Sequence, residues 1–211
     1  FLKSFLNFGN VALGNDLQLS ADIARRSKAY PLNIMKCSNC NHFQLSVSVN
    51  PDILYANNYT YLSSIGKSFV NHLRQYAAWV DSDVLKNKKS LVVDIGSNDG
   101  TCLSFFKELG HEVIGIDPAK LPSDIANRNG ICTYNDFLNE NLVKKLITQN
   151  GHADFITSHN VLAHVEDLID TFKCIYKLLR DNGTFIFEVG YFHDVLKNGF
   201  FDTTYHEHID Y

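Results

Sequence analysis

The stretch Leu91-Val-Val-Asp94-Ile-Gly96-Ser-Asn-Asp-Gly100 decides the fold class of this 211-residue chain. Its apolar beginning predicts a buried strand, and helical periodicity starts directly after Gly100. Glycine at a strand-to-helix turn lets the backbone approach a ligand, while the helix N-terminus offers unpaired N–H groups. The stretch therefore predicts a ligand-binding loop at the carboxyl end of a strand in a parallel sheet.

The chain on both sides of this loop alternates short apolar runs with amphipathic segments. Strands are expected at residues 91–94, 112–117, 131–134, 153–157 and 184–189. Helices are expected at residues 65–80, 101–109, 138–149 and 167–180, together with a shorter helix that ends at Gly130. Strands separated by helices of this length are joined by right-handed crossovers. The pattern predicts an α/β fold with a doubly wound parallel sheet.

The position of Asp94 indicates which ligand the loop binds. In a dinucleotide-binding GxGxxG loop, a glycine would stand two residues before Gly96, where this chain carries Asp94. A carboxylate at that place repels a pyrophosphate, but it can pair with the α-ammonium group of an amino acid. The DxGxxxG spacing therefore favours S-adenosylmethionine over a nicotinamide dinucleotide, and with it a Rossmann-like class I methyltransferase fold.

Further polar residues follow the neighbouring strands. Asp117 ends the second predicted strand, where its carboxylate can accept hydrogen bonds from both ribose hydroxyls. Asp136 follows the third strand and is either an acceptor for the adenine amino group or a solvated loop aspartate. Asn160 follows the fourth strand, at the edge of the sheet where ligands bind. The predicted cofactor-binding residues are Asp94, Gly96, Ser97, Asn98, Gly100, Asp117, Asp136 and Asn160.

Composition and charge exclude several classes of function. The formal net charge is −4 and the hydrophobic content is 45%, which is typical of a globular protein and unlike a non-specific nucleic-acid binder. No apolar run reaches the length of a membrane span, and no signal peptide is visible. Five cysteines, an odd number, favour a reducing cytoplasm with few or no disulfides. We expect a cytoplasmic monomer without nucleic-acid or membrane partners.

A dense polar cluster, Tyr205-His206-Glu207-His208, lies late in the sequence. If this segment is extended, the two histidines share one face and can bind a metal, although no third ligand is identified. The second interpretation is acid–base chemistry by an imidazole that a nearby carboxylate orients, and the third is a hydrogen-bonded polar loop. His164, after the fourth strand, is either a site residue or a helix-start residue bonded to backbone.

Three motifs in combination resemble the S-adenosylmethionine-dependent sugar C-methyltransferases. The motifs are Asp94-Ile-Gly-Ser-Asn-Asp-Gly100, Asn160-Val-Leu-Ala-His164 and Phe201-Asp-Thr-Thr-Tyr-His-Glu-His208. The N-terminal block resembles that family's zinc-binding region through Phe5-Leu-Asn-Phe-Gly-Asn10, Cys37-Ser-Asn-Cys40, Phe43-Gln-Leu45 and Tyr59-Thr-Tyr-Leu-Ser-Ser64. The resemblance spans essentially the whole chain. It implies a small N-terminal, candidate zinc-binding subdomain at residues 1–64 and a methyltransferase core at residues 65–211.

The resemblance also implies a reaction, the methylation of a carbon in a nucleotide-linked 4-keto deoxy-sugar. Because the keto group acidifies the neighbouring carbon, the chemistry needs a base, a donor near the oxygen and an in-line methyl sulfonium. By resemblance, His208 is the base and Glu207 orients it. Tyr59 is expected to contact the substrate, or else to be a packed loop tyrosine. Candidates for binding or polarising the keto group are Tyr205, His206 and His164.

A zinc site is implied by the CxxC pair Cys37 and Cys40. A CxxC pair places two thiolates on one tight turn, as structural zinc sites require. Members of the family typically carry two such pairs, so the other pair is expected upstream of Phe1. The alternative is two free thiols, and His42 is a candidate to complete the site in this chain.

The same resemblance implies a further C-terminal domain that helps to hold the sugar, so this chain is expected to be a fragment. Two other functions stay open at this point. One is an O-methyltransferase of a sugar or small metabolite, in which the same histidine would deprotonate a hydroxyl. The other is a non-catalytic domain that binds S-adenosylmethionine without turnover.

Overall fold

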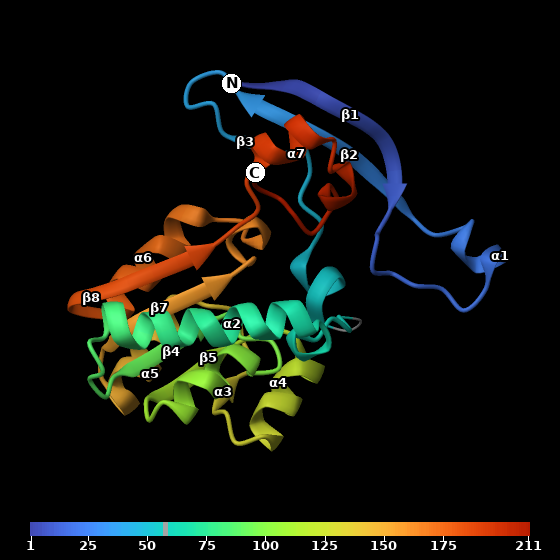
Figure 1. Cartoon of the computed structure of the whole chain (residues 1–211). Coiled ribbons are helices and arrows are strands. Elements are labelled where there is room, and N and C mark those ends of the chain that lie inside the picture. Colours follow the sequence, from blue (N-terminus) through green and yellow to red (C-terminus); the bar gives the residue numbers. More distant parts are fainter. Residues whose placement is uncertain (57–58) are drawn as a thin grey trace. The chain divides into compact units, whose positions relative to one another are not determined.

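The structure is a computed structural model that describes residues 1–56 and 59–211 (Figure 1). Its internal contacts divide the chain into two compact units. Unit one comprises Phe1–Asn58, Leu162–Glu166 and Val189–Tyr211, and unit two comprises Tyr59–Val161 and Asp167–Glu188. Each unit is thus assembled from segments that are far apart in the sequence.

Unit two contains a parallel five-stranded sheet with the order β6-β5-β4-β7-β8. The strands are β4 (Leu91–Ile95), β5 (Glu112–Ile116), β6 (Thr133–Tyr134), β7 (Ala153–His159) and β8 (Leu179–Glu188). The strand order reverses between β4 and β7, and ligands of doubly wound sheets bind at the carboxyl ends of strands at such a switch point. The predicted parallel α/β sheet is confirmed.

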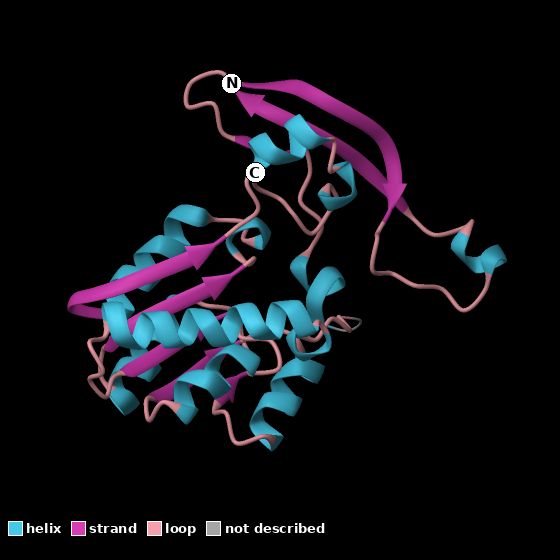
Figure 2. Cartoon of the chain, viewed as in Figure 1, coloured by secondary structure: helices cyan, strands magenta, loops and turns pink. Residues whose placement is uncertain are grey.

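Helices cover both faces of this sheet (Figure 2). They are α2 (Lys67–Trp79), α3 (Thr101–Glu108), α4 (Lys120–Arg128), α5 (Glu140–Asn150) and α6 (Leu168–Leu178). Side chains of α2, α3 and α4 pack with Val92 and Phe155, whereas those of α5 and α6 pack with Val93 and Ile156. The division follows from the strands, because successive side chains point to opposite faces.

The fifth strand begins earlier than the sequence predicts. The helix expected over residues 167–180 ends at Leu178, and Leu179 is already extended and paired with Ala153. Asn182 has a left-handed φ of 62° and lies within β8, beside a register shift in the pairing of β7 with β8. The Asn182-Gly183 turn signal therefore marks an irregularity in the strand rather than the end of the helix.

Unit one contains an antiparallel three-stranded sheet with the order β1-β2-β3. Its strands are β1 (Leu2–Ala12), β2 (Ala29–Cys37) and β3 (Phe43–Leu45). Its helices are α1 (Ala21–Ala24) and α7 (Phe192–Asn198), with short turns η1 (Asp52–Ala56), η4 (Leu162–His164) and η5 (Phe201–Thr203). A small core joins the sheet to α7 through Leu32, Ile34, Leu45, Phe192 and Val195.

Residues 209–211 are held by two other segments of unit one. The Leu45 N–H donates to the Ile209 carbonyl, and the Tyr211 N–H donates to the Phe43 carbonyl, both at 2.8 Å. The Ile209 N–H donates to the Ala163 carbonyl. These backbone bonds bring the histidine motif and the segment 162–166 onto the N-terminal sheet.

Within the described part of the chain, no helix has both the length and the apolar composition that crossing a membrane requires.

Candidate functional site

The glycine loop of unit two connects β4 to α3 through a tight turn that only glycine permits at residue 96. Gly96 has a left-handed φ of 71°, and a Cβ there would lie 2.2 Å from Cγ2 of Val161. Gly100, with a φ of 78°, is the N-cap residue of α3. The loop therefore keeps backbone, rather than side chains, at the carboxyl end of β4 and the start of α3, as ligand binding at a helix N-terminus requires.

Asp94 is buried within β4 rather than exposed at the loop, with 3% of its surface accessible. Its Oδ1 atom has no hydrogen-bond partner among the described residues. Burial, together with the negative charge of Asp117, raises the pKa of this carboxyl well above its ordinary value. An unpartnered buried carboxyl is destabilising unless a ligand satisfies it, and a ligand ammonium group is suited to do so.

Asp117, directly after β5, is held in place by two backbone donors. Its Oδ2 accepts from the Asn98 N–H and its Oδ1 from the Ala119 N–H, both at 2.8 Å. Burial raises the pKa of this carboxyl to about 6, although the two hydrogen bonds oppose the shift. Each oxygen retains accepting capacity, so the carboxylate is oriented for a ligand with two hydroxyls, as predicted for a ribose.

The side chain of Asn98 is hydrogen-bonded to the segment before α2. Its Nδ2 donates to the Tyr61 carbonyl at 3.0 Å, and its Oδ1 accepts from the Ser63 N–H at 2.9 Å. Contact between Asn98 and the cofactor stays a prediction. Ser97 is buried, and its Oγ lacks a hydrogen-bond partner in the described structure. Ser97 therefore stays a predicted ligand contact.

A polar cluster that the sequence analysis missed lies on the α2 face of the sheet. Tyr76 of α2 is hydrogen-bonded to Thr157 at 2.7 Å, and its ring packs edge-on against His159, with centroids 4.7 Å apart. Burial lowers the pKa of His159 to about 4, and its Nδ1 has no hydrogen-bond partner in the described residues. Asp94 is paired with Thr157 across β4 and β7, so it lies on the same face.

The signal for this polar cluster was present in the sequence, but Tyr76 was interpreted as a core residue. Tyr76 falls at the helical spacing of the apolar face of α2, where a core role is the simplest reading. His159 directly precedes Asn160, which attracted the prediction instead. Asn160 is exposed with a left-handed φ of 56°, and its N–H donates to the Glu188 carbonyl at 2.7 Å.

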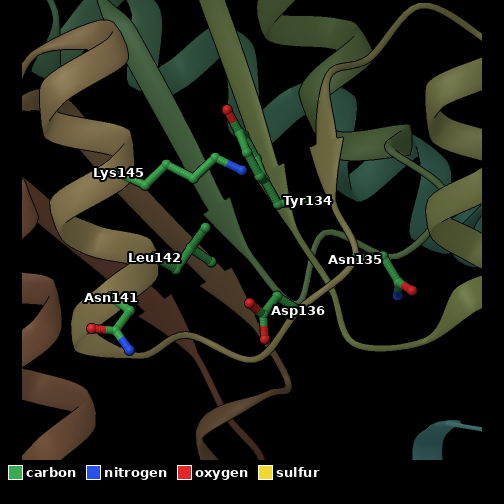
Figure 3. Close-up of a pocket in the computed structure, with 6 residues that line it drawn as sticks. All are labelled: Tyr134, Asn135, Asp136, Asn141, Leu142 and Lys145. Carbon is green, nitrogen blue, oxygen red and sulfur yellow. The ribbon is translucent and has the colours of Figure 1, made fainter.

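Asp136 lines an open pocket of about 400 Å³ at the end of β6 (Figure 3). Its Oδ1 accepts from the N–H of Phe137 at 2.8 Å, so the carboxylate stabilises the loop in which it lies. Lys145 of α5 points to the ring of Tyr134 in the same pocket, with Nζ 4.9 Å from the ring centroid. Contact between Asp136 and an adenine stays a prediction.

The histidine motif lies in unit one and forms a turn, not an extended strand. The His208 N–H donates to the Tyr205 carbonyl at 3.1 Å, which closes the turn over residues 205–208. The segment is thus not extended, so the condition under which His206 and His208 would share a face is not met. Instead, Tyr205 and His208 are adjacent, with ring centroids 4.3 Å apart.

The hydrogen bonds of His208 fix its tautomer. Its Nδ1 lies 2.8 Å from the Thr203 carbonyl, which can only accept, so Nδ1 carries the proton. In the neutral ring, Nε2 then holds the lone pair and accepts from the Tyr205 hydroxyl at 3.1 Å. Burial lowers the pKa of His208, while the hydrogen bond to Thr203 opposes this shift. The ring is thus neutral near pH 7, with Nε2 as its basic nitrogen.

His164 joins this group through Tyr55, a residue that the sequence analysis did not select. The rings of His164 and His208 lie 4.9 Å apart, and Tyr55 Oη lies 2.8 Å from His164 Nδ1. The Tyr55 hydroxyl also donates to the Glu207 carbonyl at 3.1 Å, so its single proton is used and His164 Nδ1 is the donor to Tyr55. No spacing rule links residues 55 and 164, and only the fold brings them together. We call Tyr55, His164, Tyr205 and His208 the histidine group.

Two members of the predicted set lie outside the histidine group. Glu207 does not orient His208, because its buried carboxylate accepts two hydrogen bonds from the Asn15 amide, at 2.7 and 2.8 Å. His206 is 2% exposed and donates from Nε2 to the Tyr30 carbonyl at 3.2 Å. Both side chains hold unit one together, and the Thr203 carbonyl takes the orienting role predicted for Glu207.

Tyr59, the predicted substrate contact, belongs to unit two rather than to the N-terminal block. Its ring lies edge-on to that of Tyr61, with centroids 6.5 Å apart. A role in substrate binding stays a prediction.

Replacing Tyr55 by Phe is expected to lower the free energy of unfolding by about 1–2 kcal/mol, because it leaves His164 Nδ1 and the Glu207 carbonyl without their shared partner. Urea denaturation measures this effect. The matched control is Tyr191→Phe in the same unit, where the ring is exposed and no hydroxyl hydrogen bond is described. Equal stability of both variants would contradict the assigned bonds.

Comparison with known families shows which family the chain belongs to. A family model described as "Methyltransferase domain" matches residues 68–209, which is most of the chain. The chain belongs to this methyltransferase family. A second model, described as a "putative zinc binding domain", matches residues 1–55.

Similar proteins agree with this assignment. The chain is 30% identical to the C-methyltransferase NovU of Streptomyces niveus over 206 residues, which cover 98% of this chain and 49% of that relative. The chain thus spans about half the length of this relative. The prediction that the chain is a methyltransferase is confirmed.

Two solved structures illustrate what the chain is similar to. The PH0226 protein from Pyrococcus horikoshii OT3 is 16% identical with a TM-score of 0.52, and the match covers 67% of this chain and 68% of that protein. DesVI of Streptomyces venezuelae is 13% identical with a TM-score of 0.48, over 60% of this chain and 52% of that protein. The first of these likenesses supports the Rossmann-like fold and no finer property.

The CxxC pair of this methyltransferase lies in the turn between β2 and β3. Hydrogen bonds from the backbone N–H groups of Cys40 and Asn39, and from the Cys40 thiol, lower the pKa of Cys37 to about 7. His42 is not positioned to complete a metal site, because its Nε2 donates to Asp210 at 2.7 Å. Among residues 1–56 and 59–211, no group of three or more metal-ligating side chains is assembled. A single CxxC pair offers two thiols, whereas structural zinc takes four ligands.

Proposed function

We propose that this chain is the cofactor-binding and base-bearing part of a C-methyltransferase that acts on a nucleotide-linked 4-keto deoxy-sugar. The observation that carries the proposal is the fixed tautomer of His208, whose Nε2 lone pair makes it a base near neutral pH. Residues 1–64 would form the candidate zinc-binding region and residues 65–211 the methyltransferase core, with the segments 162–166 and 189–211 packing onto the former.

The residues of unit two fit S-adenosylmethionine. The unpartnered Oδ1 of Asp94 suits the α-ammonium group, and the preoriented carboxylate of Asp117 suits the ribose hydroxyls. The Nδ1 of His159, also buried without a partner, is available to the carboxylate end of the same amino acid. When bound, S-adenosylmethionine supplies an electrophilic methyl group on sulfonium.

In this proposal, the histidine group of unit one removes the proton from the substrate. His208 Nε2 would take the proton from the carbon next to the keto group, while Nδ1 stays bonded to the Thr203 carbonyl. The Tyr205 hydroxyl, which now donates to Nε2, would be displaced and could donate to the developing enolate oxygen instead. The methyl group for this carbon would come from S-adenosylmethionine, which Asp94 and Asp117 would hold.

Mass spectrometry of the full-length protein with S-adenosylmethionine and a panel of nucleoside-diphosphate 4-keto sugars tests the proposal. We expect a product heavier by one methylene group, and exchange of the carbon proton with deuterated water that depends on the keto group. Methylation without such exchange would identify an O-methyltransferase. Binding of S-adenosylmethionine without product across the panel would favour a non-catalytic domain.

Zinc is proposed as a structural ion held in part by Cys37 and Cys40. Metal analysis of the full-length protein is expected to find about one zinc per chain, since a thiol with a lowered pKa is readily available as the thiolate that zinc binds. The double variant Cys37→Ser, Cys40→Ser should lose the metal. The matched control is Cys132→Ser, an exposed cysteine of unit two. Absence of zinc from the unmodified protein would overturn this proposal.

A further inference from the structure

A segment before α2, Tyr59–Ser64, is tied directly to the glycine loop of unit two, and we call it the tyrosine strap. Asn98 binds it twice, through the Tyr61 carbonyl and the Ser63 N–H. Asp99 binds it once, since its Oδ2 accepts from the Ser64 N–H at 3.0 Å. The strap therefore has three hydrogen bonds to two consecutive loop residues.

Asn98 also touches the predicted ribose site. Its own N–H donates to Asp117 Oδ2, while its side chain faces the strap. The residue is 7% exposed and has a left-handed φ of 50°, so its position is closely determined. Asn tolerates this conformation better than most residues, and its amide supplies both the donor and the acceptor that the strap requires.

Asp99 is held from the other side. Its Oδ1 accepts from the Thr101 hydroxyl at 2.6 Å and the Thr101 N–H at 3.2 Å, at the start of α3. The carboxylate is thus shared between the first turn of the helix and the strap. A ligand that orders this loop would therefore order the groups that hold the strap.

We propose that Asn98 is a positioning residue that couples occupation of the cofactor loop to the placement of the tyrosine strap. The inference rests on the proposed function, because it takes the loop ligand to be S-adenosylmethionine or its product. The strap carries the paired rings of Tyr59 and Tyr61, and Tyr61 is 52% exposed. Rings of this kind stack on sugars and nucleobases, so fixing the strap prepares a surface for the acceptor substrate. When a ligand has already rigidified Asn98, placing the strap costs less conformational entropy. Ligand binding and strap placement therefore favour each other.

Hydrogen exchange of the Ser63 and Ser64 amides, with and without S-adenosylhomocysteine, tests this coupling. In the wild type, we expect the ligand to slow exchange at both amides. Asn98→Gly keeps the left-handed backbone and the N–H to Asp117 but removes both side-chain bonds to the strap. We expect strap exchange to rise on the order of tenfold in this variant, and ligand protection of the strap to disappear. Because coupling is reciprocal, ligand affinity should fall at most about tenfold.

Two further variants complete the experiment. Asn98→Asp retains the acceptor for Ser63 and loses the donor to Tyr61, so it should restore part of the ligand-dependent protection. The matched control is Asn182→Gly, which replaces another left-handed Asn of unit two outside the loop and should leave strap exchange unchanged. Normal ligand binding with unchanged strap protection in Asn98→Gly would overturn the inference alone. Failure of the wild type to bind S-adenosylhomocysteine would instead overturn the proposed function, and the coupling with it.

Discussion

Replacing His208 by Ala is expected to lower turnover by about 10²–10⁴-fold while leaving the affinity for S-adenosylhomocysteine nearly unchanged. The expectation follows from the hydrogen bonds of His208, which leave Nε2 as the basic nitrogen of a neutral ring. The measurement is exchange of the substrate's acidic carbon proton with deuterated water in the absence of methyl transfer. If the variant exchanges as fast as the wild type, His208 is not the base, and His164 becomes the next candidate.

The pH profile and a matched control accompany this test. Burial lowers the pKa of His208, and a base is lost when it becomes protonated. Activity should therefore fall on acidification at a pH below the ordinary pKa of histidine. His193→Ala removes an exposed imidazole of the same unit and should leave exchange unchanged. His206→Ala is a poor control, since its buried ring supports unit one through the Tyr30 carbonyl.

Replacing Asp94 by Asn is expected to weaken binding of S-adenosylhomocysteine by one to two orders of magnitude, at about 1.4 kcal/mol per factor of ten. The amide keeps the size of the side chain but cannot offer the negative charge that a ligand ammonium group needs. Calorimetry measures the effect. Because burial raises the pKa of Asp94 and an ammonium partner would lower it again, ligand binding to the wild type should release a proton at pH values between the two pKa values. This release should vanish in the variant.

The stability of the same variant separates binding from folding. A carboxyl whose folded pKa is raised contributes stability below its unfolded pKa, and this contribution is lost as the pH rises through the folded pKa. Asp94→Asn should therefore unfold no more easily than the wild type at pH 7, and its advantage should shrink toward pH 4. A marked loss of stability at pH 7, or unchanged ligand affinity, would contradict the role assigned to Asp94. Glu112→Gln, at the exposed start of β5, serves as a control carboxylate.

Features that depend on residues close together in the chain could be predicted from the sequence. The glycine loop, the acidic strand ends and the alternation of strands with helices are local patterns, and the structure contains each of them. Asp117 shows why such predictions succeed. A strand end followed by a helix start fixes the place of the side chain, and its backbone donors lie within 19 residues.

The histidine motif shows where local reasoning fails. Strand alternation paired His206 with His208, but the turn at residues 205–208 pairs Tyr205 with His208. Glu207 finds its partner in Asn15, 192 residues earlier in the chain. Tyr55 reaches His164 over 109 residues. Contacts at such separations depend on the assembled fold, and no spacing in a single sequence specifies them.

The way in which unit one is assembled has a consequence for biosynthesis. Besides its pairing with β2, β3 has backbone hydrogen bonds with residues 209–211, so more than 160 residues must leave the ribosome before these bonds can form. All five strands of the parallel sheet precede that point in the chain, and unit two can therefore acquire its structure first. During synthesis the N-terminal sheet therefore has an unpaired edge at β3. An unpaired strand edge can pair with other chains, so the nascent chain is most prone to aggregate in this state, and chaperone binding would be most useful then. The histidine group is accordingly among the last parts of the chain to mature.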